Sequence, residues 1–546
     1  MTGDITTGAS SAHVYPLTIR ELLLTGVRRA PEQQIVYADK RRLTYREFEE
    51  RVGRLGSALA ALGVRPGHVV AVMDWDTNRY LECFFAVPMM GAVLHTVNVR
   101  LSPEQVLYTI NHAPDDMILV NGEFLPMLEE IWDRVVPGKK LVLMSDSGAT
   151  ITTSLPLAGE YEALLAAADP DYNFPALDEN TRATTFYTTG TTGLPKGVFF
   201  SHRQLVLHTF AAANALSGTG HGCFNEDDVY MPITPMFHVH AWGVPYIATM
   251  RGVKQVYPGR YQPDTLARLI EREKVTFSHC VATLFEMVMA GARRCAVDLK
   301  GWKVIIGGGP LPHSLAAQGV EAGIDVFGGY GLSETCPVLT ISRLRPEMLA
   351  WDRERQLEVR CRAGRPIDLV QIRVVDAAMN DVPRDSRSAG EIVVRAPWLT
   401  QGYLHDQAAS NKLWDGGWLH TGDIGMLTPD GYLRITDRLK DVIKTGGEWV
   451  SSLDLEDMLA QMPQVAEAAV IGVPDPKWSE RPLAIVVPRG DDTVDPDQMR
   501  AHLMGFVSRG ELSKYGVPDR VVVLDEIPKT SVGKIDKKAL RQRFPA

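Results

Sequence analysis

Short apolar runs alternate with segments of helical periodicity along most of the chain. The runs Val69–Met73 and Met117–Val120 are uninterrupted, as buried parallel strands are, and Tyr80–Met90 between them has the length and spacing of a helix. The same alternation continues with runs at Ala92–Val97, Leu141–Met144, Val229–Ile233, Lys254–Tyr257, Val275–Cys280 and Val304–Ile306 and helices at Asp264–Lys274 and Leu284–Arg294. The pattern predicts an α/β fold in which helices cover a largely parallel sheet.

The first clear helix is expected to begin at a capping box. Thr44 and Glu47 have the spacing in which each side chain binds the backbone N–H of the other. Apolar residues follow at helical spacing until Gly63, so this helix should bury one face.

The pattern changes in the last third of the chain. Val370–Val375 and Gly390–Val394 are short strands with polar turns between them, which predicts a small β-rich subdomain. After the charged segment Asp437–Asp441 comes a new series, with a helix near Asp454–Gln461 and strands at Ala468–Val473, Leu483–Val487 and Arg520–Leu524. We therefore expect a domain of residues 1–438 and a small domain of residues 439–546 that forms its own core.

The amino-acid composition mainly excludes classes of protein. The chain has 546 residues, 45% of them hydrophobic, and its net charge of −9 argues against nucleic acid as a partner. The six cysteines are scattered without a CxxC pair, which favours a reducing cytoplasm over a disulfide framework. Neither a signal peptide nor an apolar run of about 20 residues is present, so integral membrane association is not expected.

The segment Thr184–Gly197 joins an apolar, β-rich lead-in to a loop of hydroxyls, glycines and one lysine. Glycine amides can face an anion without a Cβ in the way, threonine hydroxyls add donors, and Lys196 adds charge. The segment is not a Walker A loop, because Gly197 follows the lysine. A phosphate-binding loop is expected, with a surface turn as the alternative, and its candidate residues are Thr188, Thr189, Gly190, Thr191, Thr192 and Lys196.

The segment Gly328–Thr335 places an aromatic ring between glycines. The ring of Tyr330 can lie against a flat base, and Glu334 can hold a Mg²⁺ that bridges phosphate oxygens, since magnesium prefers one or two carboxylates plus substrate phosphates. The alternative is a glycine turn with a solvated glutamate.

Three further segments carry candidate polar groups. Asp423 can accept hydrogen bonds from both hydroxyls of a ribose, and Arg438 adds a donor, although a turn aspartate and a surface ion pair are alternatives. Lys444–Trp449 offers a glycine-lined path for a narrow thiol-bearing arm, or a tight turn. The basic C-terminal run is expected to be mostly a solvated helix end, but Lys534 follows Gly533 on a loop and can present its ammonium group to something outside the domain.

Together these segments resemble the adenylate-forming superfamily, which contains acyl-CoA synthetases, the adenylation domains of peptide synthetases and firefly luciferase. The resemblance rests on the loop at 188–197, Gly-Tyr-Gly-Leu-Ser-Glu-Thr at 329–335, Thr-Gly-Asp at 421–423, Asp-Arg-Leu-Lys-Asp at 437–441 and Gly533-Lys534. It implies a large N-terminal domain of α/β and β-rich subdomains and a small, mobile α+β C-terminal domain. It also implies an acid–thiol ligase that converts a carboxylic acid and ATP to acyl-AMP and pyrophosphate and then forms acyl-CoA, with Mg²⁺ as cofactor.

The resemblance implies roles for single residues. Lys534 is the catalytic lysine, and Lys440 is the hinge about which the small domain rotates between half-reactions. Mg²⁺ is held by Thr188 and Glu334, and the ribose by Asp423 and Arg438. The nucleotide site also includes Gly329, Tyr330 on adenine, Gly331, Ser333 and Thr335, and the CoA tunnel is lined by Lys444, Gly446, Gly447, Glu448 and Trp449.

The acyl pocket is expected around Pro235–Trp242. If this stretch is helical, His238 and Trp242 lie on one face because they are four residues apart. By resemblance, His238 lies beside the acyl carboxylate, and Trp242 lines the acyl entrance opposite Gly308 and Gly309, with core packing as the alternative for the tryptophan. Phe237 belongs to the same pocket, and the segment Pro476–Pro482 looks most like the branch that handles medium- and long-chain fatty acids, which also contains ligases for short thioether acids.

Other functions remain as alternatives. The chain can be a ligase for a short thioether or aromatic acid, or an acyl-AMP ligase that feeds a separate carrier protein, since only 12 residues follow Lys534. A nucleotide-binding scaffold is disfavoured by the joint presence of Glu334 and Lys534, and a zinc hydrolase by the lack of an HExxH motif. The expected partners are the acid, ATP and CoA, and a homodimer is left open.

Overall fold

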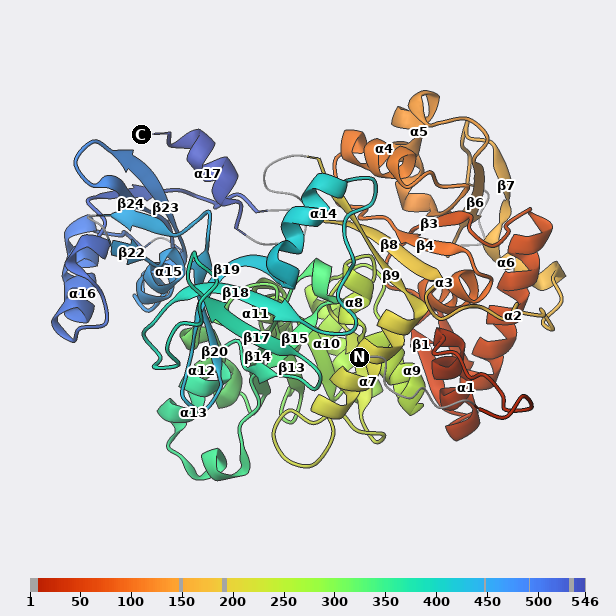
Figure 1. Ribbon diagram of the computed structural model, residues 1–546, viewed down its shortest axis with the longest axis horizontal. Coiled ribbons are helices and arrows are strands. Elements are labelled where there is room, and N and C mark those ends of the chain that lie inside the picture. The colour runs from red at the N-terminus through yellow and green to blue at the C-terminus, as the bar shows by residue number, and fades with distance from the viewer. Residues whose placement is uncertain are drawn as a thin grey trace.

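The computed structural model describes residues 8–146, 151–188, 194–445, 448–490, 492–529 and 535–545. Within these residues the strands form four sheets. Figure 1 shows the chain passing from two sheets with their helices, through a β-rich region, to a separate group of strands and helices at the C-terminus. This is the expected α/β class with a β-rich part and a small C-terminal unit.

The first sheet has the strand order β16–β15–β14–β13–β12–β10–β11–β1–β2. Its central pairs are parallel, and the pairs β1–β2, β14–β15 and β15–β16 at its ends are antiparallel. Its strands are β1 Gln34–Tyr37, β2 Arg41–Thr44, β10 Val229–Pro232, β11 Lys254–Tyr257, β12 Phe277–Cys280, β13 Lys303–Ile306, β14 Asp325–Gly331, β15 Val338–Ile341 and β16 Arg365–Pro366.

The second sheet has the order β7–β6–β5–β3–β4–β8–β9, and only the β8–β9 pair is antiparallel among these strands. Its strands are β3 Val69–Met73, β4 Val93–Thr96, β5 Met117–Asn121, β6 Lys140–Met144, β7 Leu157–Glu160, β8 Arg182–Thr188 and β9 Lys196–Ser201. The expected largely parallel arrangement is therefore confirmed, but it is divided between two sheets.

Helix α3 (Asn78–Met89) lies between the two sheets. It contacts β1 of the first sheet and β3, β4 and β8 of the second, and every one of its residues is buried. Because the helix has no solvent-facing side, its charged side chains are paired rather than solvated, Arg79 with Asp146 and Glu82 with Arg51. The other helices of this region are α1 Ile19–Arg29, α2 Tyr45–Ala61, α4 Pro103–His112, α5 Leu125–Ile131, α6 Tyr161–Ala167, α7 His202–Ala215, α8 Val239–Trp242, α9 Val244–Arg251, α10 Pro263–Glu273, α11 Ala282–Cys295, α12 His313–Glu321 and α13 Arg353–Arg360.

The N-terminal helices correct one expectation. The capping box at Thr44 is confirmed, with both reciprocal hydrogen bonds to Glu47 at the start of α2. However, α2 is not the first helix, because α1 precedes it and buries Ile19, Leu22 and Val27. The spacing of these apolar residues was a sufficient signal for that helix.

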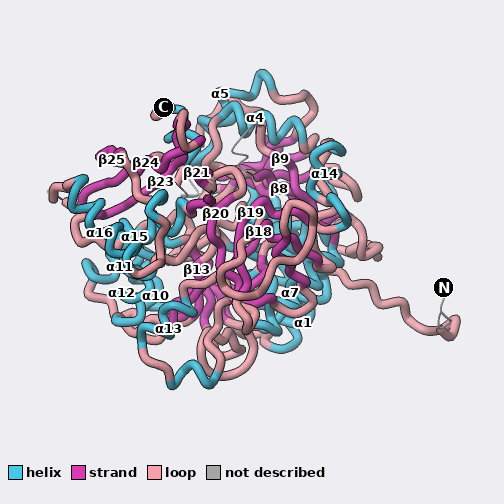
Figure 2. The backbone as a smooth tube through the Cα atoms, turned by 60° about the vertical axis from the view of Figure 1, so that its left-hand side comes forward, coloured by secondary structure: helices cyan, strands magenta, loops and turns pink. Residues whose placement is uncertain are grey.

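The β-rich part is an antiparallel sheet of order β17–β18–β19–β20, as the sequence predicted. The C-terminal sheet has the order β22–β21–β24–β23 with β25 beside β24, and an apolar cluster covers each of its faces. Figure 2 shows these strands and α15 close to β19 and β20. The elements are β17 Gln371–Val375, β18 Gly390–Arg395, α14 Gln407–Leu413, β19 Leu419–Leu427, β20 Leu433–Arg438, β21 Ile443–Thr445, β22 Glu448–Val450, α15 Ser452–Ala460, β23 Val465–Asp475, β24 Ser479–Pro488, α16 Pro496–Ser508, β25 Arg520–Val523 and α17 Lys537–Arg543.

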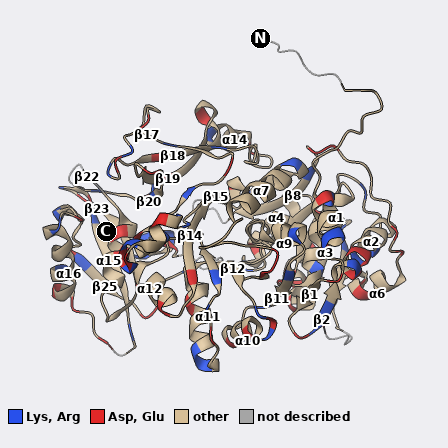
Figure 3. Ribbon diagram, turned by 90° about the horizontal axis from the view of Figure 1, so that it is seen from below, with Lys and Arg blue, Asp and Glu red and all other residues tan. Residues whose placement is uncertain are grey.

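Figure 3 shows acidic and basic positions interspersed along the ribbon. Within the part of the chain that the structure describes, no helix is both long enough and apolar enough to cross a bilayer.

Candidate active site

Tyr330, Asp423 and Arg438 meet through strand pairing. β19 and β20 place Asp423 directly opposite Arg438, and the Nε atom of Arg438 lies 3.3 Å from Oδ1 of Asp423. Tyr330, near the end of β14, donates its hydroxyl to Oδ2 of Asp423 at 2.8 Å. Burial, and secondarily the charge of Asp423, raise the pKa of Tyr330 well above its usual value, so the phenol remains a donor.

A second cluster joins Glu334 to Lys196 through a residue that the sequence analysis missed. Tyr403 donates its hydroxyl to Oε1 of Glu334 at 2.8 Å, and the Nζ atom of Lys196 lies 4.6 Å from the centroid of the Tyr403 ring. Thr188 is the strand partner of Lys196 in the β8–β9 hairpin. The hairpin thus brings Thr188 and Lys196, the two candidate residues of the phosphate loop that the structure describes, to its loop end.

Tyr403 had a weak sequence signal. It follows Gly402, as Tyr330 follows Gly329, but it lies in a segment without a recognised motif. Burial and the neighbouring carboxylate of Glu334 raise its pKa, so its hydroxyl stays protonated and donates. A pocket of about 380 Å³ lies beside this cluster, lined by Tyr108, His112, Leu194–Gly197 and Tyr403–Asp406.

The loop that carries Glu334 is held by its own backbone. A Cβ at Gly331 would lie 1.7 Å from the carbonyl oxygen of Pro337, so only glycine fits there. The hydroxyl of Thr335 accepts the N–H of Leu332 at 2.9 Å and donates to the same carbonyl of Pro337, and the side chain is fully buried. Ser333 opens the short 3₁₀ helix Ser333–Thr335, and Gly329 pairs with Ile341 across β14 and β15.

The segment after His238 corrects the helical expectation. Val239, His240, Ala241 and Trp242 have φ angles of 48°, 55°, 47° and 58°, so the turn α8 is left-handed. For residues other than glycine this costs roughly 1–2 kcal/mol each, because Cβ approaches the following carbonyl oxygen. The spacing of four residues between His238 and Trp242 therefore does not place them on one face of a right-handed helix.

Trp242 is buried against a glycine that the sequence analysis did not name. A Cβ at Gly307 would lie 2.9 Å from Cη2 of Trp242, and the indole ring centroid is 5.0 Å from that of His279. Gly308 has a φ of 73°, and a Cβ at Gly309 would contact nothing within 4 Å. The acyl-pocket roles of Trp242, Gly308 and Gly309 stay predictions.

The remaining candidates are only partly described. Thr189, Gly190, Thr191, Thr192, Gly446, Gly447 and Lys534 lie outside the described residues, as do the side chains of Glu448 and Trp449. Lys444 lies in β21, where its N–H donates to Oε2 of Glu480 at 2.8 Å.

Lys440 lies in the turn between β20 and β21, and C-terminal elements bind both sides of this turn. Oδ2 of Asp437 accepts the N–H of Ser452 at 2.6 Å, and Oδ1 of Asp441 pairs with Arg541 of α17 at 2.7 Å. Burial raises the pKa of Asp437. The predicted hinge is therefore a short turn between two anchored carboxylates.

The sequence profile described as AMP-binding enzyme matches residues 24–404, and that described as AMP-binding enzyme C-terminal domain matches residues 454–534. The chain belongs to the AMP-binding enzyme family. The resemblance inferred from the five motifs is thereby confirmed.

The relatives agree with this assignment. A long-chain-fatty-acid–CoA ligase of Thermus thermophilus is 42% identical over 92% of this chain and 90% of its own length. A 3-methylmercaptopropionyl-CoA ligase of Ruegeria lacuscaerulensis is 38% identical over 97% of each chain. The expected enzyme class, an AMP-forming acid–thiol ligase that works through an acyl adenylate and uses ATP and CoA, is confirmed.

Solved structures support the fold. The crystal structure of an anthranilate CoA ligase in complex with anthranoyl-AMP superposes with a TM-score of 0.83 at 23% identity, covering 98% of this chain and 99% of that one. At this identity the likeness concerns the fold, with its large N-terminal and small C-terminal parts.

Proposed function

We propose that this ligase activates a medium- or long-chain fatty acid. The convergence of Tyr330, Asp423 and Arg438 beside the loop that carries Glu334 supports a nucleotide site, and the long-chain substrate named for the Thermus relative supports the acid. A short thioether acid is the second candidate, because the Ruegeria relative is named for 3-methylmercaptopropionate.

The carboxylic acid must be activated before a thiol can attack it. A carboxylate is a poor electrophile for a thiol, because its carbonyl carries negative charge and its leaving group would be an oxide. Attack of the carboxylate on the α-phosphorus of ATP expels pyrophosphate and gives acyl-AMP, whose leaving group is AMP. The protein contributes mainly by positioning and by stabilising charge. We assign the ribose to Asp423 and Arg438, adenine to Tyr330, and the acyl carboxylate to His238.

The oxygen donors of Thr188 and Glu334 suit Mg²⁺. Magnesium prefers a few hard oxygen ligands plus substrate phosphates, and both side chains are half-buried, Thr188 at the end of β8 and Glu334 in the 3₁₀ helix Ser333–Thr335. When bound, the ion would supply neutralisation of the triphosphate charge. The hydrogen bond from Tyr403 would orient the Glu334 carboxylate for that purpose.

The second half-reaction needs a thiol but must exclude water. We propose that the domain of residues 439–546 rotates about Lys440, removing Lys534 and bringing Lys444, Gly446 and Gly447 to the CoA path. The cytoplasm is the proposed location, supported by the six cysteines without a CxxC pair.

A panel of acids tests the proposed substrate. The protein with ATP, Mg²⁺ and CoA is expected to release AMP and form thioester fastest with acids of medium or long chain. AMP, ADP and thioester would be measured for acids from acetate to palmitate, with 3-methylmercaptopropionate and benzoate included. Release of ADP would contradict the mechanism, and highest kcat/KM with a short or aromatic acid would contradict the assigned substrate.

Replacing Asp423 by alanine is expected to raise the KM for ATP by about tenfold or more. The reason is the loss of hydrogen bonds to a charged group, each worth roughly 1.5–3 kcal/mol. Asp381→Ala is the matched control, since Asp381 also pairs with an arginine of the β-rich sheet, Arg373, at 2.6 Å but is exposed. An unchanged KM for ATP in Asp423→Ala would remove this residue from the ribose site.

A further inference from the structure

Two buried side chains at the carboxyl ends of β3 and β4 hold the backbone just before His238. Oδ1 of Asp76 accepts the N–H of Met236 at 2.9 Å, and the hydroxyl of Thr96 donates to the carbonyl of Phe237 at 2.9 Å. Asp76 is 3% exposed and Thr96 is 1% exposed. Neither side chain has a part in the chemistry described above.

The two side chains come from one edge of the sheet. Thr96 ends β4, Asp76 follows the end of β3, and these strands are parallel neighbours. Their carboxyl ends therefore lie together, which is where α/β sheets bind ligands. The segment that they hold follows β10 of the other sheet, so the contacts join the two sheets at the expected acyl site.

Both carboxylate oxygens of Asp76 are used. Oδ2 accepts the hydroxyl of Tyr261 at 2.5 Å, and the carbonyl of Asp76 accepts the N–H of Gly259 at 2.8 Å. Burial raises the pKa of Asp76 to about 7, against the lowering effects of Tyr261, the Met236 amide and Arg100. Burying a carboxylate costs folding free energy unless its hydrogen bonds compensate for lost hydration. We attribute the burial of the Asp76 side chain to a role in fixing the backbone at Met236.

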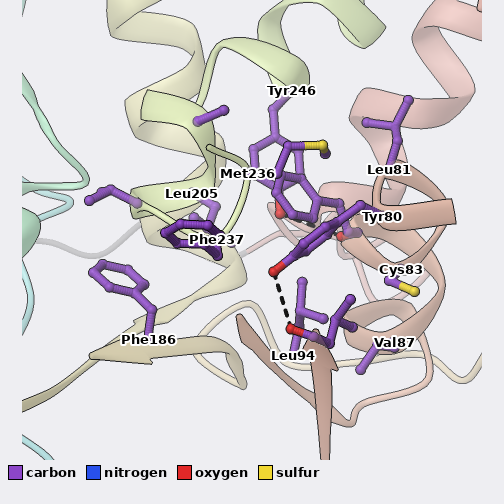
Figure 4. Close-up of a cluster of buried hydrophobic side chains, with 14 of the residues drawn as sticks. Tyr80, Leu81, Cys83, Val87, Leu94, Phe186, Leu205, Met236, Phe237 and Tyr246 are labelled. Carbon is purple, nitrogen blue, oxygen red and sulfur yellow. Dashed lines mark hydrogen bonds between the residues drawn. The ribbon is translucent and has the colours of Figure 1, made fainter. Parts of the chain in front are cut away.

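The held segment leads into the strained turn. The side chains of Met236 and Phe237 lie in a buried cluster with Tyr80, Leu205 and Phe186 (Figure 4). Two residues later the backbone enters the left-handed turn of Val239–Trp242. Such a conformation persists only where the surroundings fix it, and the contacts of Asp76 and Thr96 fix its entrance.

We propose that Asp76 and Thr96 are positioning residues that hold His238 at the acyl carboxylate by fixing the backbone of Met236 and Phe237 between the two sheets. This inference rests on the proposed role of His238. The side chains act through the backbone and do not touch the substrate.

The test compares Thr96→Val with Thr109→Val in acid-dependent ATP–pyrophosphate exchange. Thr109 is the matched control, because it is 1% exposed and donates to a backbone carbonyl, that of Val106, at 2.9 Å in α4. We expect Thr96→Val to lower kcat/KM for the acid about tenfold with KM for ATP within twofold, and Thr109→Val to lower neither. Thr96→Ser, which keeps the hydroxyl, is expected to restore kcat/KM. Asp76→Ala, which removes the acceptor of the Met236 N–H, is expected to behave as Thr96→Val. If this variant does not fold, the comparison of Thr96→Val with Thr109→Val still tests the proposal.

A double-variant cycle tests whether the loss of kcat/KM in Thr96→Val depends on His238. In a His238→Ala background, Thr96→Val is expected to cause no further loss, because its effect passes through His238. Additive losses, an equal effect of Thr109→Val, or a wild-type kcat/KM in Thr96→Val would overturn the positioning role. An active wild-type protein with fully active variants contradicts this inference alone, whereas a wild type that adenylates no acid contradicts the proposed function as well.

Discussion

Replacing Lys534 by alanine is expected to slow acyl-AMP formation by about 10²–10³-fold and to leave thioester formation from supplied acyl-AMP nearly unchanged. Removal of one preorganised charge contact to the transition state typically has an effect of this size. The lysine belongs to the first half-reaction only, since the acyl adenylate no longer carries the triphosphate. ATP–pyrophosphate exchange measures the first step, and CoA consumption with chemically prepared acyl-AMP measures the second.

Two further variants test the result for Lys534→Ala, one as a control and one as its converse. Lys538→Ala removes an exposed lysine of the neighbouring helix α17 and is expected to change neither step. Lys440→Pro is expected to show the converse of Lys534→Ala, with adenylation kept and thioester formation lost, because proline restricts rotation at the proposed hinge. Equal loss of both half-reactions in Lys534→Ala would contradict the assigned role.

Replacing Glu334 by glutamine is expected to lower the adenylation rate by about 10²–10³-fold and to raise the Mg²⁺ concentration needed for half-maximal rate. The amide keeps the size of the side chain and can still accept from Tyr403, but it lacks the charge that magnesium prefers. Titration of the exchange reaction with MgCl₂ separates the two effects.

Glu347→Gln is the matched control, since Glu347 is an exposed glutamate paired with Arg345 at 2.9 Å. We expect it to show the wild-type rate and magnesium dependence. If Glu334→Gln shows an unaltered magnesium dependence, the proposed metal site loses its carboxylate ligand.

The local hydrophobic pattern predicted several elements with their bounds. The strands β3 and β11 agree with the predicted bounds, and the capping box sets the start of α2. The pairing of Asp423 with Arg438 and Tyr330 also joins residues that motifs had already named. The agreement for β3, β11 and α2 has one cause, since periodicity and capping depend on residues only a few positions apart.

The sequence by itself determined the α/β class, the family and most of the candidate nucleotide residues. Only the tertiary structure decided that Tyr403 binds Glu334, that the turn after His238 is left-handed, and that Asp76 and Thr96 hold its entrance. The physical reason is that such contacts depend on which strands are neighbours and on how two sheets face each other. Strand order brings together residues far apart in the chain, and local hydrophobic pattern does not encode it.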